Sequence, residues 1–371
     1  MKHPVILPLI AAVALGCGDT AGPAPDDDRV RPAAQRVVGM ALSNLSTCAL
    51  TADGLLHCWG ENRTGEFGDG TTKPSFTPVP GAGGMALASV HGSMGTTQMC
   101  GITANGTGYC WGFNERGELG AGYMGHQQPP VPIAGGLRFR TVSTAYNGCG
   151  VATDGRVYCW GSAGGGQLGT GADVDSPVPA AIASAARYST VTTGTGFSCA
   201  LREADGRADC WGSGAGMGSG PPARSVNAPT PVSGDLSFTR ISAGVEHVCA
   251  LADDGQAWCW GNLGPAGGFR AAPERVPGER RFVQIASGAR MFGYGTSCGL
   301  TEGGEVHCWH DGQAPIVLPG NRRFAGITGG YHEFCGYTAG GAAFCWRWAG
   351  LDSDGKSVLS PPVAIPALSA G

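Results

Sequence analysis

The chain has 371 residues and 42% of them are apolar, so it can bury one large or two ordinary hydrophobic cores. Charged residues make up only 14%, and the formal net charge of -4 comes without a run of Lys or Arg, which excludes the basic footprint of a nucleic-acid-binding protein. The 66 glycines and 25 prolines approach the composition of low-complexity chains. A regular repeat along the sequence would therefore distinguish a folded chain from a low-complexity one.

The amino terminus is predicted to direct export. An apolar run from Val5 to Leu15 has the length of a signal-peptide core and is too short to span a bilayer. It ends at "ALGCGD", which resembles the bacterial lipobox, and the resemblance implies that Cys17 becomes the lipidated first residue of the mature protein. The alternative is an ordinary secretory signal with an incidental cysteine. Residues 1–16 are thus expected to be a signal peptide.

A tether and one folded domain are expected to follow. Residues 17–36 begin with the lipidated cysteine and continue with Pro, Asp and Ala without hydrophobic periodicity, which predicts a flexible segment. Residues 37–371 are predicted to form the domain that this tether holds away from a membrane.

The cysteines form a regular series. Setting Cys17 aside from the 15 leaves consecutive pairs, six with nine intervening residues and one with ten. No pair has the two-to-four-residue spacing of zinc ligands, so seven disulfides are favoured over a metal array, and no metal site is expected. Disulfides belong in an oxidising compartment, in agreement with export. The pairs are Cys48 and Cys58, Cys100 and Cys110, Cys149 and Cys159, Cys199 and Cys210, Cys249 and Cys259, Cys298 and Cys308, and Cys335 and Cys345.

The two cysteines of each pair are predicted to lie opposite each other across an antiparallel hairpin. If Cys249 lies opposite Cys259, Leu251 pairs with Ala257 and the three residues "DDG" remain for the loop, with Gly255 in the left-handed conformation. The Asp-Gly turn then sets the register and the disulfide locks it. Each bridge closes a short loop, worth about 2–3 kcal/mol on the chain-entropy model.

A tryptophan follows every second cysteine. Alternation of side chains along a strand places it on the face opposite the cysteine, so both faces of the hairpin are filled. Such strands belong in stacked sheets, and the tryptophan is predicted to fill the space between two sheets; a ligand platform is the alternative. The tryptophans are Trp59, Trp111, Trp160, Trp211, Trp260, Trp309 and Trp346.

The whole arrangement repeats. First cysteines lie 49 to 52 residues apart, and the last interval is 37 residues, which leaves the sixth unit the least regular. Each unit contains an apolar strand, the cysteine hairpin and a proline-flanked segment that suits an outer edge strand, where a missing N–H donor does little harm. Seven units of three to four short strands predict an all-β, seven-bladed β-propeller with one disulfide in each blade.

The same residues carry a family resemblance. A strand, "CAL", a "DG" turn, "CWG" and "N-x-x-G-x-L-G" resemble the regulator of chromosome condensation repeat, in a bacterial exported, cysteine-paired form. "CWGENRTGEFGDG" from Cys58 and "CWGFNERGELGAG" from Cys110 match closely, whereas the units at Trp309 and Trp346 lack the glycine that follows the tryptophan. The resemblance covers about residues 37–366 and implies the propeller fold. It implies much less about activity, because family members do different things on one scaffold.

Motifs for chemistry are few. "GGGQLG" at Gly164 to Gly169 satisfies G-x-G-x-x-G, yet it follows a hairpin strand and opens no predicted helix, so it is interpreted as a blade loop. "DSDG" at Asp352 to Gly355 lacks the later Glu of a calcium loop and is interpreted as a turn. The eight histidines occupy unlike positions of the repeat. No catalytic residue and no cofactor are expected.

The units differ most between "CWG" and the next "CAL". One such stretch contains Arg290, Met291, Phe292 and Tyr294, residue types that are enriched at interface anchors, which makes it a candidate binding loop. The alternative is a loop that merely covers an irregular sixth blade.

The function expected from the sequence is binding. The chain is interpreted as a monomeric, lipid-anchored, non-enzymatic module at the bacterial envelope or cell surface, which touches the membrane through its anchor alone. Its partner would be an envelope or extracellular protein or a glycan, and no nucleic acid is expected. Two alternatives remain: an envelope hydrolase or lyase on a polysaccharide, with carboxylates gathered at one propeller mouth, and a purely structural surface protein.

Overall fold

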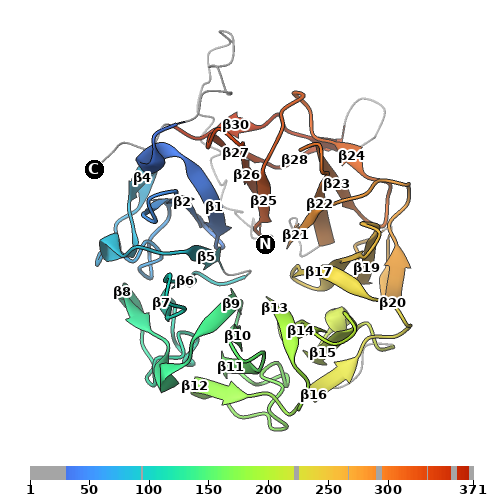
Figure 1. Cartoon of the computed structure of the whole chain (residues 1–371), viewed down its shortest axis with the longest axis horizontal. Helices are drawn as coiled ribbons and strands as arrows, with labels where there is room; N and C mark the ends of the chain where they lie inside the picture. The colour runs from blue at the N-terminus through green and yellow to red at the C-terminus, as the bar shows by residue number, and fades with distance from the viewer. Residues whose placement is uncertain are drawn as a thin grey trace, which may run out of the picture.

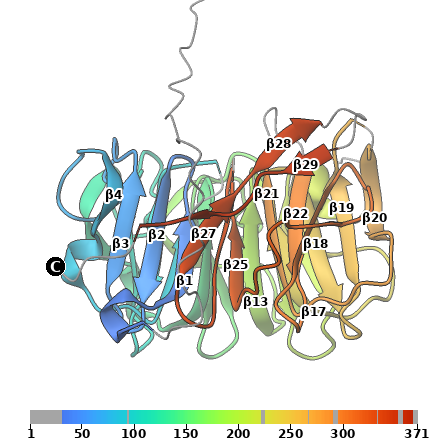
Figure 2. The same ribbon diagram turned by 90° about the horizontal axis from the view of Figure 1, so that it is seen from above.

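The computed structural model describes residues 31–92, 95–220, 225–265, 267–289, 295–331, 333–351 and 357–366. Over these ranges the protein consists of seven four-stranded antiparallel sheets, arranged as blades around a ring (Figure 1). Seen from the side, the strands run between the two faces of the ring (Figure 2). The prediction of an all-β, seven-bladed β-propeller is confirmed.

Within each blade the innermost strand comes first in the chain and the outermost comes last. A two-stranded hairpin, β28 and β29, interrupts only the seventh blade in the described part of the chain. Short 3-10 helices accompany the strands: η1 (Ala33–Gln35), η2 (Ala82–Gly84), η3 (Ala134–Gly136) and η4 (Ala215–Met217). The strands of blades one to three are β1 (Val37–Leu42), β2 (Ser46–Thr51), β3 (Leu56–Gly60) and β4 (Ser75–Pro80); β5 (Ser89–Gly92), β6 (Met99–Ile102), β7 (Gly108–Gly112) and β8 (Gln127–Pro132); and β9 (Phe139–Thr144), β10 (Asn147–Ala152), β11 (Val157–Gly161) and β12 (Ser176–Ala181). Those of blades four and five are β13 (Tyr188–Gly194), β14 (Phe197–Arg202), β15 (Ala208–Gly212) and β16 (Val226–Pro231); and β17 (Phe238–Ala243), β18 (His247–Ala252), β19 (Ala257–Asn262) and β20 (Phe269–Arg275). Those of blades six and seven are β21 (Gln284–Ala289), β22 (Gly295–Leu300), β23 (Val306–His310) and β24 (Ile316–Val317); and β25 (Gly326–Gly329), β26 (Phe334–Tyr337), β27 (Ala343–Trp346), β28 (Trp348–Leu351), β29 (Ser357–Leu359) and β30 (Val363–Ala364).

The two central strands of each blade form the predicted hairpin. Cys249 lies opposite Cys259 and Leu251 opposite Ala257, and Gly255 has a φ of 79° in the turn. The prolines also lie where expected, in outermost strands such as β4, β8, β12 and β16.

All seven neighbouring cysteine pairs are disulfide-bonded, with Cα atoms 4.0 to 4.1 Å apart. Every bridge joins the two central strands of one blade, and none joins two blades. The expected disulfide in each blade is therefore confirmed. The bridges join Cys48 to Cys58, Cys100 to Cys110, Cys149 to Cys159, Cys199 to Cys210, Cys249 to Cys259, Cys298 to Cys308, and Cys335 to Cys345.

The turn glycine of each hairpin also joins its blade to the next. The backbone N–H at or just before the start of an inner strand donates to the carbonyl of the turn glycine in the preceding blade, over 2.8 to 3.0 Å. Because the same bond recurs at all seven joints, the turn glycine sets the spacing of the blades as well as the hairpin register; it follows Asp in four blades, Asn in blade two and Gly in blades six and seven. The donor and acceptor pairs are Leu87 and Gly54, Phe139 and Gly106, Tyr188 and Gly155, Phe238 and Gly206, Phe282 and Gly255, Phe324 and Gly304, and Val37 and Gly341.

The tryptophans lie between blades, and four of them are hydrogen-bonded there. At four successive joints the indole N–H donates to a backbone carbonyl in the loop that follows "CWG" in the preceding blade. The glycine two residues after the acceptor packs against the same indole: Gly120, at a φ of 66°, would place a Cβ 2.9 Å from Trp160 Cδ1. The loop with the G-x-L-G pattern therefore stabilises the contact between neighbouring blades. The donors and acceptors are Trp111 and Glu66, Trp160 and Glu118, Trp211 and Gln167, and Trp260 and Gly216, at 2.7 to 3.0 Å.

Blades six and seven depart from this pattern. Blade six is complete, but its outer strand β24 has two residues. The Nε1 atoms of Trp309 and Trp346 are buried without a hydrogen-bond partner in the described ranges. The β28–β29 hairpin lies over blade six instead of a G-x-L-G loop (Figure 2), and Trp348 packs edge-on against His310, with ring centroids 4.4 Å apart.

The ring closes by packing, without a shared strand. Blade one is built from the first four strands, and blade seven from β25, β26, β27 and β30. Val37, Met40 and Leu42 of β1 form a buried cluster with Cys335 and Ala343 of blade seven. The backbone bond from Val37 to Gly341 completes the joint.

Candidate functional site

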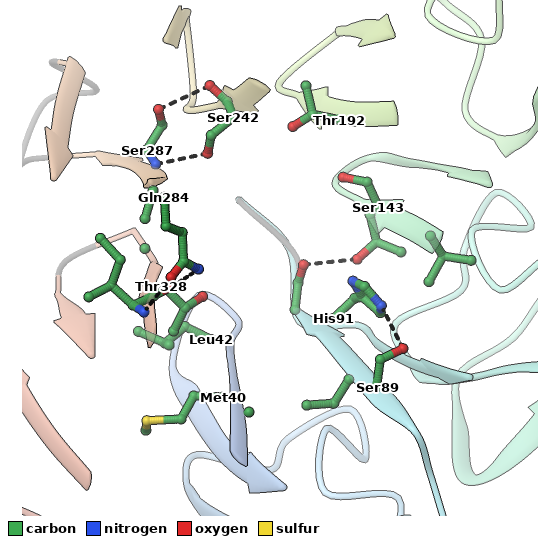
Figure 3. A pocket seen from close by; sticks show the side chains of 18 of the residues that line it. Met40, Leu42, Ser89, His91, Ser143, Thr192, Ser242, Gln284, Ser287 and Thr328 are labelled. Carbon is green, nitrogen blue, oxygen red and sulfur yellow. Dashed lines mark hydrogen bonds between the residues drawn. The ribbon is translucent and has the colours of Figure 1, made fainter. Parts of the chain in front are cut away.

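The inner strands of all seven blades surround a central channel with a volume of 380 Å³ (Figure 3). Hydroxyl and small apolar side chains dominate its lining. Among the described residues that line it there is no carboxylate, no ammonium and no guanidinium. The channel is therefore polar without formal charge.

Most of the hydroxyls in this central channel join adjacent blades. Ser143 Oγ lies 3.0 Å from Thr193 Oγ1, between blades three and four. The Ser287 N–H donates to Ser242 Oγ over 2.9 Å, between blades six and five, as Figure 3 shows. The side chain of Gln284 pairs with the backbone of Ile327 in the same way. These groups are engaged in holding the ring together.

His91 is the imidazole among the described side chains that line the channel. Its Nε2 lies 3.1 Å from Ser89 Oγ (Figure 3), and desolvation lowers the pKa of His91 to about 4. The imidazole is thus neutral near pH 7. Acid and base catalysis by a pair of carboxylates, as glycoside hydrolysis requires, has no carboxylate to use among the described lining residues.

A second hollow, of 490 Å³, lies among the loops that connect strands within blades two, three and four, on the face opposite the turns of the cysteine hairpins. We call it the blade two–four groove. Phe113 and Arg116 from the β7–β8 loop line it, together with Tyr146 from the β9–β10 turn and Ser213, which follows β15. Tyr146 is 41% exposed and the Arg116 side chain 62% exposed. The groove therefore presents aromatic and cationic groups to solvent.

The scaffold holds these groups from behind. Phe113 stacks on His126, with centroids 5.1 Å apart, and Arg116 lies 3.4 Å from Asp175. Asn147, next to Tyr146, is buried, and its Nδ2 donates to Ser198 Oγ of the next blade over 3.1 Å. Side chains that are exposed on a rigid frame are what a binding surface needs.

Two carboxylates also line the groove, Glu115 and Glu118. Burial raises the pKa of Glu118, and the nearby charge of Glu115 raises it further. The Glu118 Oε2 atom nevertheless accepts the N–H of Arg116 over 2.8 Å, as Glu66 accepts the N–H of Thr64 in blade one. Because the contact recurs in another blade, we interpret Glu118 as a loop-stabilising residue.

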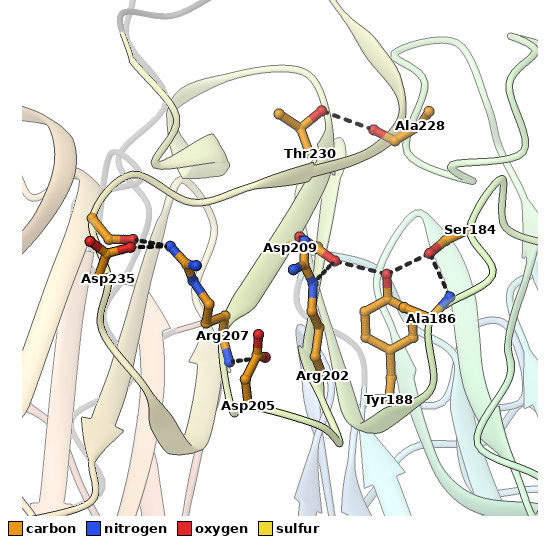
Figure 4. Close-up of polar contacts among 11 residues, drawn as sticks. Ser184, Ala186, Tyr188, Arg202, Asp205, Arg207, Asp209, Ala228, Thr230 and Asp235 are labelled. Atoms are coloured by element: carbon orange, nitrogen blue, oxygen red, sulfur yellow. Dashed lines mark hydrogen bonds and ion pairs between the residues drawn. The ribbon is translucent and has the colours of Figure 1, made fainter.

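Blade four contains a buried ionic network (Figure 4). The guanidinium of Arg202 donates twice to the carboxylate of Asp209, over 2.7 and 2.6 Å, and the Tyr188 hydroxyl donates to Asp209 Oδ2 over 2.8 Å. Burial raises the pKa of Tyr188 to about 12. Every oxygen of Asp209 has a donor, so the network stabilises the blade and leaves no free group for a ligand.

The structure describes some of the predicted site residues and not others. The cysteines form the expected disulfides, whereas Cys17 and the candidate loop residues Arg290, Met291, Phe292 and Tyr294 lie outside the described residues, as does the "DSDG" turn. Ala289 and Gly295, which flank the candidate loop, pair at the ends of β21 and β22. The blade two–four groove was missed, although a large aromatic such as Tyr146 in a tight turn was a visible signal.

One group of metal-ligating residue types comes together in the described part of the chain: Glu333, Cys335 and Cys345. The two cysteines are disulfide-bonded to each other, so neither offers a thiolate. This group cannot hold a metal ion as it stands. Within the described residues, no helix is long and apolar enough to cross a membrane.

Three segments of the chain match models of a known repeat. Residues 154–201 match one sequence profile of the regulator of chromosome condensation (RCC1) repeat, and residues 37–66 and 238–262 match another. The human E3 ubiquitin-protein ligase HERC2 is 32% identical over 94 residues, which are 25% of this chain and 2% of HERC2. The chain thus spans a very small part of that relative.

Solved structures show the same fold. Human WBSCR16 superimposes with a TM-score of 0.69 at 18% identity, over 80% of this chain and 86% of that one. Prp20p from Saccharomyces cerevisiae superimposes with a TM-score of 0.66 at 17% identity, over 80% of each chain. The protein is therefore a seven-bladed propeller, and three of its segments match models of the RCC1 repeat.

Proposed function

We propose that this protein is an exported, lipid-anchored propeller that binds an envelope or extracellular protein or glycan, without enzymatic activity, through the blade two–four groove. The observation that carries the proposal is the exposure of Tyr146 and Arg116 beside the half-buried Phe113 in one groove. Tyr and Arg are the side chains most often found at the energetic centre of interfaces.

Export and anchoring rest on the sequence and on the disulfides. Seven bridges favour an oxidising compartment, and Cys17 follows an apolar run of signal-peptide length. Among structures of the same fold, Prp20p is described by its binding to Gsp1p and histones. That supports a binding role for the scaffold and leaves the partner of this chain to be identified.

The test is capture from envelope extract with the full-length chain. Tyr146→Ala combined with Arg116→Ala should lower capture of a specific partner at least tenfold, because each truncated anchor typically costs 1 kcal/mol or more. Tyr123→Ala combined with Arg156→Ala is the matched control, since Tyr123 is 42% exposed and the Arg156 side chain 58%. Equal loss in both double variants, or in neither, would contradict the proposed surface.

The candidate loop with Arg290 and Tyr294 is a second contact that the sequence supports. Arg290→Ala combined with Tyr294→Ala should weaken capture of the same partner while the melting temperature stays nearly unchanged. If the loop variant alone abolishes capture, the binding surface lies on blade six and the groove is a structural hollow.

A further inference from the structure

A pocket of 350 Å³ lies at the joint where the ring closes, between blades seven and one. We call it the seam pocket. Trp59 and Phe76 of blade one form one side, and Glu333, Arg347 and Val363 of blade seven form the other. It is separate from the blade two–four groove, so each of the two sites can be tested without the other.

The seam pocket occupies the place of a missing loop. At the joints before blades two to five, the preceding blade contributes a loop whose carbonyl accepts the indole N–H and whose glycine packs on the ring. Blade seven has "CWRWAG" instead, and its chain turns at Trp348 into the hairpin over blade six. Nothing in the described part of blade seven therefore takes the position of the G-x-L-G loop.

Trp59 shows the consequence. Trp111, Trp160 and Trp211 are fully buried in their joints, whereas Trp59 is only partly buried, against the cluster that closes the ring. Its Nε1 makes no hydrogen bond to the part of the chain that the structure describes, although the equivalent atom donates at four other joints. At those joints the indole N–H points to the loop of the preceding blade, so at this joint it is the donor that the missing loop would have satisfied.

The rim of the pocket is unusually apolar for a protein surface. Phe76 is 82% exposed and Val363 68% exposed, and both line the pocket beside Pro78 and Ile365. Contiguous apolar side chains around a hollow mark binding sites more often than single exposed residues do. An occupant with an apolar side chain would remove both from water.

The floor carries a carboxylate. Glu333 Oε1 accepts the Thr47 hydroxyl over 3.1 Å, and within the described ranges no salt bridge neutralises this carboxylate. Burial raises the pKa of Glu333, while the charge of Arg347 opposes that rise. A cationic group in the pocket would pair with Glu333 and complete its hydrogen bonding.

We propose that the seam pocket binds a short peptide segment of a partner protein that supplies what the missing loop would supply. Its backbone carbonyl accepts the Trp59 N–H, an apolar side chain covers Phe76 and Val363, and an adjacent Lys or Arg side chain pairs with Glu333. The occupant is thus a basic residue next to an apolar one, in a tight turn that contains glycine.

Two acetylated and amidated heptapeptides test this. One has the sequence of residues 114–120, "NERGELG", and the other carries the equivalent of Glu118→Lys. Calorimetric titration of the full-length protein should show saturable binding of the lysine peptide and at least tenfold weaker binding of the glutamate peptide. Glu333→Gln should remove most of that preference.

Trp59→Phe keeps an aromatic side chain and removes the N–H donor. It should weaken binding of the lysine peptide roughly 2- to 12-fold, which is the range of one net hydrogen bond. Trp258→Phe is the matched control, because Trp258 is also half-buried and does not line the pocket. Melting temperatures of all variants establish that they fold. The proposal is overturned if the lysine peptide does not bind at millimolar concentration, or if the two peptides bind alike. It is equally overturned if Trp59→Phe weakens binding of an oligosaccharide and not of the peptide.

Discussion

The backbone N–H of Val37, at the start of the first blade, donates to the carbonyl of Gly341, in the last cysteine hairpin, over 3.0 Å. This bond joins the two ends of the repeat array in the same way that each blade is joined to its successor. The seventh joint is therefore a copy of the other six on the side of the cysteine-hairpin turns. On the opposite face it lacks the indole hydrogen bond that the joints before blades two to five make, and the seam pocket lies there.

Gly341→Ala should destabilise the closed ring. Gly341 has a φ of 88°, and a Cβ there would lie 2.3 Å from Arg36 Cγ and 2.6 Å from Arg36 Cα. Gly135 has the same φ with no atom within 4 Å of the added Cβ, so Gly135→Ala isolates the backbone strain. We expect Gly341→Ala to lower the free energy of unfolding by about 1–3 kcal/mol more than Gly135→Ala, as measured by denaturant titration. Equal losses would show that the closing joint yields without strain.

Trp160→Phe should cost more stability than Trp309→Phe. Both indoles are buried, but Trp160 Nε1 donates to the Glu118 carbonyl over 2.9 Å, whereas Trp309 Nε1 has no partner in the described ranges. Removing the first donor leaves a buried carbonyl unsatisfied, which costs about 1–3 kcal/mol. Thermal unfolding of the two variants measures the difference. If Trp309→Phe is the more harmful, the indole N–H does not stabilise the joint.

His247 should make the fold sensitive to acid. Its side chain is buried, its Nε2 lies 3.0 Å from Ser297 Oγ, and burial lowers the pKa of His247 to about 4. Between pH 6.5 and 4 the unfolded chain takes up a proton that the folded chain refuses, so stability falls as the pH falls, by about 3 kcal/mol at the lower limit.

The variant that tests this is His247→Asn, because Asn147 makes the equivalent contact with Ser198 in blade three. Melting temperatures of the variant should decline less between pH 7 and pH 4 than those of the natural protein. An identical decline would place the acid sensitivity elsewhere.

Cys17→Ala should release the protein from the membrane fraction. Cys17 is the one cysteine of the 15 that falls outside the seven pairs, and it follows the lipobox-like "ALG". Fractionation of expressing cells and the mass of the mature amino terminus measure the outcome. Retention in the membrane fraction, together with an amino terminus that carries no lipid, would contradict the lipid anchor.

The parts of the fold that could be predicted are those that the sequence specifies locally. The register of Cys249 on Cys259 follows from nine intervening residues and an Asp-Gly turn, all within one hairpin, and the extra residue between Cys199 and Cys210 leaves those two cysteines opposite each other as well. The contact of Trp160 with Glu118 could not be predicted, because it joins residues 42 positions apart in the sequence and depends on how the blades pack. The G-x-L-G pattern was visible, but its partner was not.

The candidate surfaces were harder still to predict. The groove around Tyr146 and the pocket around Trp59 each combine side chains from different blades, so neither has a continuous sequence signature. The pocket is also defined by a loop that blade seven lacks. Comparison among the repeats shows that the glycine and the loop after Trp346 are absent. The closed arrangement of the blades is needed to show that Trp59 lies next to that position.

Each blade is complete in itself, because all of its strands come from one stretch of the chain and its disulfide closes a hairpin of neighbouring residues. The hairpin and disulfide of blade one can therefore form before the later blades fold, and no strand of its sheet comes from the carboxyl-terminal part of the chain. The same independence means that the chain could be circularly permuted at any joint, with the present termini linked and new ones opened between two blades. A propeller whose first and last strands share one sheet would lose that sheet on such a cut, whereas this one would lose a single backbone connection.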